Sequence, residues 1–245
     1  MTVLINEWSE LAGQTIKWLS PDSEDAYKQN CANSDRRRML EAFGWIDVEI
    51  EYQFNSQGFR TPEFDQRSNW IALGCSFTQG TGVNVSDRWT DIVADQIGLH
   101  CWNLAAAGAA GDTCYRIARH YIPKLLPKFV VYLEPRYNRT ELMTSKQAAP
   151  WVINWAHDAR NWPGEYVKYL ISESENLELN AEKNREAIRS ICLQNNVQLI
   201  VYSPDAFRSM VSDSTQHDLG RDLLHPGRLN NQAFAKVVAK DIQQL

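Results

Sequence analysis

The feature that most constrains how this chain folds is an alternation between short apolar runs and longer segments with apolar residues at helical spacing. The apolar runs lie at residues 70–75, 100–105, 129–133 and 197–203. This alternation is typical of βαβ units, in which each buried strand is followed by a helix that covers the sheet. We therefore predict an α/β protein with three α/β/α layers and a flavodoxin-like central parallel sheet of about five strands.

Two regions fall outside this alternation. Residues 1–69 contain a stretch at 48–54 in which apolar and polar side chains alternate, which indicates a half-exposed strand. We expect 1–69 to be an N-terminal extension with a β-hairpin, packed on a core domain at 70–245. An aromatic-rich insertion at about 140–176 interrupts that domain. Its tryptophans fit either a small hydrophobic cluster or a lid over a substrate.

Composition excludes several classes of protein. The formal net charge is −5, which does not favour a nucleic-acid partner. The N-terminus has no basic leader followed by an apolar run, and no stretch is long and apolar enough to span a membrane, so a cytoplasmic location is expected. The five cysteines form no CxxC pair, which argues against a zinc site and a disulfide framework. We expect no metal or organic cofactor, and the sequence does not indicate an oligomeric state.

The segment "IALGCSFTQG" at 71–80 raises a question about chemistry, because it follows an apolar run with a small nucleophilic residue and a glycine-rich bend. A phosphate-binding loop, an ordinary turn and a nucleophile at a strand tip are the competing interpretations. A phosphate loop needs a lysine after its last glycine, and none follows Gly80 or Gly82. The spacing of Gly74, Gly80 and Gly82 does not fit a dinucleotide fingerprint either. The turn and the nucleophile remain open, the latter being Ser76.

A serine nucleophile needs a base to take its proton, and the base is usually a histidine held by a carboxylate. Asp222 and His225 lie three residues apart, just before the last predicted helix. This spacing allows the carboxylate to contact the imidazole. His217, next to Asp218, is the rival base.

A serine hydrolase also needs donors for the oxyanion that forms in the reaction. Gly108 follows the second predicted strand, and Asn138 follows the third. In a parallel sheet these positions lie at the same edge as Ser76. The candidates for the oxyanion hole are therefore the backbone N–H of Ser76, the N–H of a glycine after the second strand (Gly108, with Gly111 as the fallback) and the side-chain amide of Asn138.

Taken in order, these residues resemble the four sequence blocks of the SGNH, or GDSL-like, hydrolase superfamily. The blocks are Gly74-Cys75-Ser76, Asn103 to Gly108, Asn138, and Asp222-x-x-His225. The resemblance covers about residues 70–139 and 197–245. Cys75 stands where the family usually has aspartate, and the segment around Asn138 departs from the usual third block.

The resemblance implies a serine hydrolase that cleaves a carboxylic ester through an acyl-enzyme intermediate. Ser76 would be the nucleophile, His225 the base and Asp222 the residue that orients the base. The implied partner is a small-molecule or glycan ester, such as an acetyl group on a carbohydrate. The two departures from the family pattern motivate an alternative, in which the same fold is a non-catalytic binding or assembly module.

Overall fold

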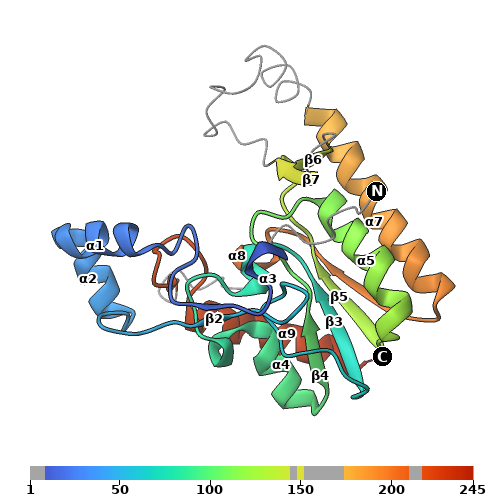
Figure 1. The fold of residues 1–245 in the computed structure, drawn as a ribbon, viewed down its shortest axis with the longest axis horizontal. Coiled ribbons are helices and arrows are strands. Elements are labelled where there is room, and N and C mark those ends of the chain that lie inside the picture. Colours follow the sequence, from blue (N-terminus) through green and yellow to red (C-terminus); the bar gives the residue numbers. More distant parts are fainter. Residues whose placement is uncertain (1–8, 144–147, 152–173, 210–216, 245) are drawn as a thin grey trace.

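A parallel sheet of four strands forms the centre of the computed structural model, which describes residues 9–143, 148–151, 174–209 and 217–244. The strands are β3 (Asn69–Leu73), β4 (His100–Asn103), β5 (Phe129–Leu133) and β8 (Gln198–Tyr202). Their order across the sheet is β4-β3-β5-β8, so β3 lies between β4 and β5 (Figure 1). This places the carboxyl end of β3 between the ends of its two neighbours, which is where ligands bind in such sheets.

The sequence predicted a parallel sheet of about five strands, and the described part of the chain contains four. All four apolar runs become strands of this sheet, and no further strand joins it there. After β8 the chain forms the short helix α8 (Ala206–Ser209), and from residue 217 it runs through a loop into α9 (Arg228–Ile242).

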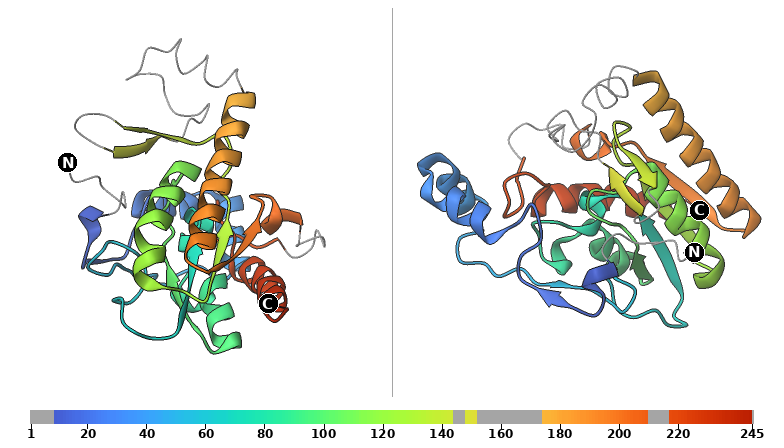
Figure 2. Two further views of the ribbon diagram at one scale, coloured as in Figure 1. Left: turned by 90° about the vertical axis from the view of Figure 1, so that its right-hand side faces the viewer. Right: turned by 45° about the horizontal axis from the view of Figure 1, so that its top comes forward.

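Helices cover both faces of the sheet, which confirms the three-layer prediction. The helices of the core are α3 (Ser76–Gln79), α4 (Trp89–Ile97), α5 (Gly111–Leu125), α7 (Ser174–Gln194), α8 and α9. Ile71 and Leu73 of β3 belong to the hydrophobic cluster with α5 and α7, whereas Trp70 and Ala72 belong to the cluster with α4 and α9. Successive side chains of a strand point to opposite faces, so each strand contributes to both clusters. The two helical layers are visible in Figure 2.

The extension before the sheet has its own hydrophobic cluster. Its elements are η1 (Ser9–Leu11), β1 (Thr15–Ile16), α1 (Glu24–Ala32), α2 (Ser34–Ala42) and β2 (Tyr52–Gln53); a further 3-10 turn, η2 (Val85–Asp87), follows the glycine-rich bend. The alternation at 48–54 appears in the burial of Ile50, Tyr52 and Phe54, although only Tyr52–Gln53 pairs as a strand. Its partner β1 is antiparallel. Helices α1 and α2 lie between the two strands in the sequence, so no tight turn joins them. Figure 1 shows α1 and α2 projecting to one side of the sheet.

The predicted insertion at 140–176 is described only at its two ends. β6 (Thr140–Met143) pairs with β7 (Ala148–Trp151) in an antiparallel ladder, and α7 begins at Ser174. The choice between a lid and a hydrophobic cluster falls on residues outside the described part. No helix among the described residues has the length and apolar character that a bilayer-spanning helix requires.

The start of α9 is set by a buried carboxylate from the preceding loop. The two oxygens of Asp218 accept the backbone N–H groups of Leu229 and Asn230, at 2.9 and 3.0 Å. A Cβ atom on Gly227 would lie 2.4 Å from the same carboxylate, so only glycine fits there. Unpaired N–H groups in the first turn of a helix are stabilised by an acceptor of this kind. Asp218 therefore fixes the residue at which the loop ends and the helix begins.

We expect Asp218→Ala to lower the free energy of unfolding by about 1–2 kcal/mol, because two N–H groups of α9 lose their acceptor. Urea unfolding followed by circular dichroism measures this change. Asp95→Ala, on the exposed face of α4, is the control and should leave the midpoint nearly unchanged. Equal midpoints for the two variants would contradict the capping role.

Candidate functional site

Ser76 lies just after the central strand β3, in a turn that requires glycine at position 74. β3 ends at Leu73, and Ser76 is the first residue of α3. A Cβ atom on Gly74 would lie 2.3 Å from Oγ1 of Thr78 and 2.9 Å from the carbonyl oxygen of Leu133. Glycine at this position thus lets β3 pass close to β5 and turn at once into the helix.

Ser76 and its neighbour Cys75 are in different surroundings. Cys75 is 7% exposed and belongs to the hydrophobic cluster under α5 and α7. Ser76 is 5% exposed, and its Oγ lies 2.8 Å from Nε2 of His225. The hydroxyl, and not the thiol, is therefore the nucleophilic group that contacts the imidazole.

A continuous chain of hydrogen bonds joins Ser76, His225 and Asp222. Nδ1 of His225 lies 2.5 Å from Oδ2 of Asp222, on the opposite side of the ring from Ser76. The other oxygen of Asp222 accepts the backbone N–H groups of Leu224 and His225, both at 3.0 Å. Two backbone donors thus fix the carboxylate, and both of its oxygens accept hydrogen bonds. The loop that carries it is closed by a hydrogen bond of 2.8 Å from the Gly220 N–H to the carbonyl oxygen of His225.

The environment of Asp222 keeps this carboxylate ionised. Burial alone would raise its pKa, but the hydrogen bond and charge of the His225 ring, with the two backbone donors, hold the pKa below its usual value. An ionised carboxylate only accepts hydrogen bonds, so the proton of a neutral His225 ring lies on Nδ1. Nε2 is then left as the acceptor for the Ser76 hydroxyl.

The rival pair His217 and Asp218 has another arrangement. His217 is exposed, and the carboxylate of Asp218 is occupied by the first N–H groups of α9. Of the two histidines, the structure brings only His225 to Ser76. The edge of the Phe77 ring packs against the His225 ring with centroids 5.6 Å apart, which further fixes the imidazole.

Gly108 and Asn138 lie in the loops that follow the two neighbours of β3. The N–H of Ala106 donates to the carbonyl oxygen of Gly74 at 3.3 Å, so the loop after β4 lies against the tip of β3. Arg139 donates to the carbonyl oxygen of Ala109 at 3.4 Å, which ties the Asn138 segment to the Gly108 segment. The structure therefore gathers the three segments at one edge of the sheet.

Two of the three candidate donors, the backbone N–H groups of Ser76 and Gly108, have no acceptor among the described residues. Gly108 has a positive φ of 78°, which glycine adopts without strain, and neither its N–H nor that of Ser76 has an acceptor there. The side-chain oxygen of Asn138 is buried and also lacks a partner. The oxygen and nitrogen of an amide exchange places on a half-turn of the group, so this end of Asn138 presents either a donor or an acceptor. Buried polar groups without partners are rare outside functional sites.

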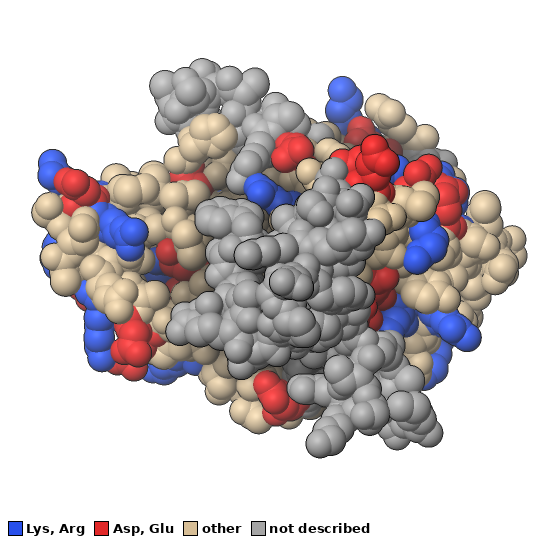
Figure 3. Space-filling view, turned by 90° about the horizontal axis from the view of Figure 1, so that it is seen from above, with Lys and Arg blue, Asp and Glu red and all other residues tan. Residues whose placement is uncertain are grey.

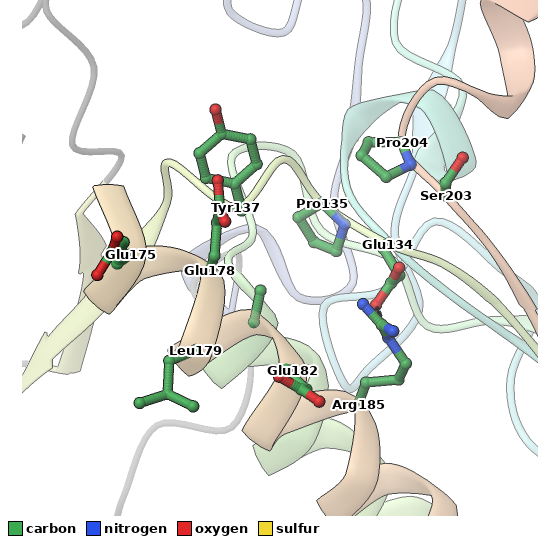
Figure 4. A pocket seen from close by; sticks show the side chains of 11 residues that line it. Glu134, Pro135, Tyr137, Glu175, Glu178, Leu179, Glu182, Arg185, Ser203 and Pro204 are labelled. Atoms are coloured by element: carbon green, nitrogen blue, oxygen red, sulfur yellow. Dashed lines mark hydrogen bonds and ion pairs between the residues drawn. The ribbon is translucent and has the colours of Figure 1, made fainter. Parts of the chain in front are cut away.

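Two cavities open beside these residues. One of about 290 Å³ lies next to His225 and is lined by Phe77, Phe207, His217, Leu219, Leu224, Pro226 and Asn230. The other, of about 520 Å³, lies between the ends of β5 and β8 and helix α7. Figure 4 shows Glu175, Glu178 and Glu182 projecting from α7, and Arg185 reaching toward Glu134, with which it forms an ion pair of 2.7 Å. The first cavity is mostly apolar, and the second is acidic.

The described residues offer no site for a metal. They contain no group of three or more His, Cys, Asp or Glu side chains placed to hold an ion. Figure 3 shows acidic and basic side chains interspersed over the described part of the face seen from above, with no basic patch of the kind that binds nucleic acid.

The sequence named Asn103 only as the start of a family block and did not mark Arg221, and both residues hold these loops. Asn103 donates to the carbonyl oxygen of Thr78 at 2.6 Å, which fixes the segment after Ser76. Arg221 is buried beside Asp222 and pairs with Asp22 of the N-terminal extension. An arginine in a polar loop gives no local signal of burial, because its partner is 199 residues away.

No family model and no curated protein matches the chain. Solved structures match it at low sequence identity. They are SGNH or GDSL-like hydrolases and esterases. Three examples are the psychrotrophic esterase EstA from Pseudoalteromonas (12% identity, 72% of this chain and 97% of that chain, TM-score 0.39), the lipase/acylhydrolase from Enterococcus faecalis (13%, 72% and 96%, 0.39) and the Clostridium thermocellum family 3 carbohydrate esterase (11%, 72% and 97%, 0.39).

The two histidines provide the first test of the site. Because only His225 contacts both Ser76 and Asp222, we expect His225→Ala to lower kcat/KM for a model ester by about 10³-fold or more. His217→Ala should keep kcat within about twofold of the unsubstituted protein, since His217 contacts neither residue; because His217 lines the cavity beside His225, any effect should fall on KM. Steady-state kinetics on both variants decides the assignment, and an inactive His217→Ala protein would overturn it.

Proposed function

We propose that this protein is a serine hydrolase that cleaves carboxylic esters through an acyl-enzyme intermediate. The observation that carries the proposal is the hydrogen-bond chain from Oγ of Ser76 through His225 to Asp222. A serine hydroxyl is a weak nucleophile unless an adjacent base takes its proton. Here the imidazole of His225 lies 2.8 Å from the hydroxyl, and the carboxylate of Asp222 holds that imidazole on its far side.

The proposed reaction proceeds in two halves. Oγ of Ser76 forms a bond to the ester carbonyl carbon, and its proton moves to Nε2 of His225. The bond to the alcohol oxygen then breaks, and His225 gives the proton to the leaving alkoxide. Water next attacks the acyl-enzyme and gives a proton to His225. The acid leaves as that proton returns to Ser76. Asp222 stays ionised throughout and stabilises the imidazolium that forms twice.

The oxyanion of each tetrahedral intermediate requires donors at the same edge of the sheet. We assign this role to the N–H groups of Ser76 and Gly108 and to the amide of Asn138. What supports the assignment is that these groups lie in three adjoining segments, and that the N–H groups of Ser76 and Gly108 lack acceptors among the described residues. Donors that are already fixed in place cost little reorganisation when charge develops.

A small acyl group, such as acetyl on a carbohydrate, is the substrate that we propose to test first. The apolar cavity beside His225 has a volume of about 290 Å³, enough for a short chain or for part of an alcohol group. A panel of p-nitrophenyl acetate, butyrate and octanoate with an acetylated xylose therefore separates acyl length from the nature of the alcohol.

The same panel with two adjacent variants tests the proposal. Ser76→Ala should lose activity by about 10³-fold or more, because the covalent step is removed. Cys75→Ala should retain most of the activity, because the thiol lies in the hydrophobic cluster and not at the imidazole. Loss of activity only in Cys75→Ala would move the nucleophile to sulfur. No activity of the unchanged protein on any ester would favour the non-catalytic module.

Asn138 has a test of its own. A donor directed at developing charge acts on the transition state more than on substrate binding. Asn138→Ala should thus lower kcat by about 10²–10³-fold, with a much smaller change in KM. A thermal melt is measured on the same sample. Normal kcat with a lowered melting temperature would show that Asn138 only stabilises its loop.

A further inference from the structure

We propose that Asp22 and Tyr52 of the N-terminal extension are positioning residues for the Ser76–His225–Asp222 chain. They join the loop after Ser76 to the loop that carries Asp222 and His225. This inference rests on the proposed function, since it concerns the geometry of the same site. Neither residue touches the reacting atoms.

The first contact is a buried ion pair next to Asp222, whose carboxylate holds His225. Arg221, which directly precedes Asp222, pairs with both oxygens of Asp22 at 3.0 and 2.7 Å. Asp22 is 1% exposed and Arg221 is 2% exposed. Two parallel hydrogen bonds between planar groups fix their relative orientation as well as their distance.

Every other side-chain contact of Arg221 described here also comes from the extension. Its guanidinium donates to the carbonyl oxygens of Lys17 and Val48, at 3.0 and 3.1 Å. It also lies 3.9 Å from the centre of the Trp18 ring. The extension thus surrounds the side chain of Arg221, the residue that precedes Asp222.

The second contact reaches the loop that follows Ser76. The Tyr52 hydroxyl donates to Oδ2 of Asp22 at 2.5 Å and accepts the backbone N–H of Gly82 at 2.9 Å. Burial, followed by the charge of Asp22, raises the pKa of Tyr52, so the hydroxyl stays protonated. The carbonyl oxygen of Gly82 in turn accepts the N–H of Arg221 at 2.9 Å. Gly82, Tyr52, Asp22 and Arg221 therefore form a closed ring of hydrogen bonds.

Gly82 also lies directly against the carboxylate of Asp222. Its φ is +79°, and a Cβ atom there would lie 3.0 Å from Oδ1 of Asp222. A shift of this loop would therefore change the space that Asp222 occupies. The ring of hydrogen bonds fixes the position of the Gly82 loop relative to the Asp222 carboxylate.

Arg60 adds a parallel connection from the end of the extension. It donates to the carbonyl oxygens of Gly80 and Val83, at 2.5 and 3.0 Å, and stacks on the Tyr52 ring at 4.3 Å. Tyr52 is thus held from one side by Arg60 and bonded on the other to Asp22 and Gly82. In the bend after Ser76, the carbonyl groups of Gly80 and Val83 are thus satisfied by the extension.

These contacts have a catalytic consequence, because proton transfer depends on exact placement. A displacement of about 1 Å in a catalytic group costs on the order of 10²-fold in rate. The hydrophobic clusters on both faces of the sheet contain no residue of the segment between Ser9 and Phe54. We therefore expect that loss of one hydrogen bond in the ring disturbs the site before it disturbs the sheet.

Tyr52→Phe is the sharpest test, because it removes a single hydroxyl and leaves the Asp22–Arg221 pair intact. Kinetics are measured on folded protein well below its melting temperature. We expect kcat to fall by about 10- to 100-fold with KM nearly unchanged. Arg221→Lys, which keeps the buried charge but not the paired hydrogen bonds, should lower kcat in the same way. This second variant decides the question if Tyr52→Phe does not fold.

Tyr202→Phe is the matched control. Its hydroxyl donates to Asp241 at 2.7 Å, near the end of α9 that lies farthest along the chain from His225. It should lose a little stability and keep its kcat. Tyr52→Phe and Arg221→Lys with normal kcat would overturn the inference and leave the esterase proposal standing. If the protein without any substitution is inactive on the whole ester panel, the inference and the esterase proposal are both overturned.

Discussion

The hydrogen bond between Oγ of Ser76 and Nε2 of His225 connects residues that are 149 positions apart, and the site depends on it. Each partner is placed by a different constraint. Ser76 is fixed by the glycine turn at the end of β3, and His225 by the closed loop that ends at α9. The parallel sheet is what makes these constraints meet, since it orders the strand ends along one edge.

The charged groups that are buried around this bond have partners among the described residues. Asp222 accepts two backbone N–H groups in addition to the His225 ring, and Asp218 accepts two more at the start of α9. Arg221 and Asp22 pair with each other. A buried charge without such partners would cost several kcal/mol. Among the uncharged groups, the side-chain oxygen of Asn138 is buried without a partner, as are Oγ1 of Thr78, Nε2 of Gln79 and Oδ1 of Asn230.

Local patterns in the sequence predicted the parts of the site that local structure determines. Ser76 follows an apolar run, and Asp222 and His225 have a spacing that one short loop can close, so local patterns were enough to name three residues that the structure brings into contact. The number of strands was overestimated because the fold class, and not a fifth apolar run, suggested it. The alternation at 48–54 predicted which side chains are buried, but not that only two residues would pair as a strand. The pair of Asp22 and Arg221 had no local signal, because tertiary packing alone brings them together.

Labelling with a fluorophosphonate tests the central claim most directly, because this reagent forms a stable bond only with an activated serine. The folded protein is treated, digested and mapped by mass spectrometry, beside His225→Ala as a control. The account predicts a single adduct on the peptide that contains Ser76, and no adduct on that peptide in His225→Ala. An adduct on another residue, or none on the folded protein, would contradict it.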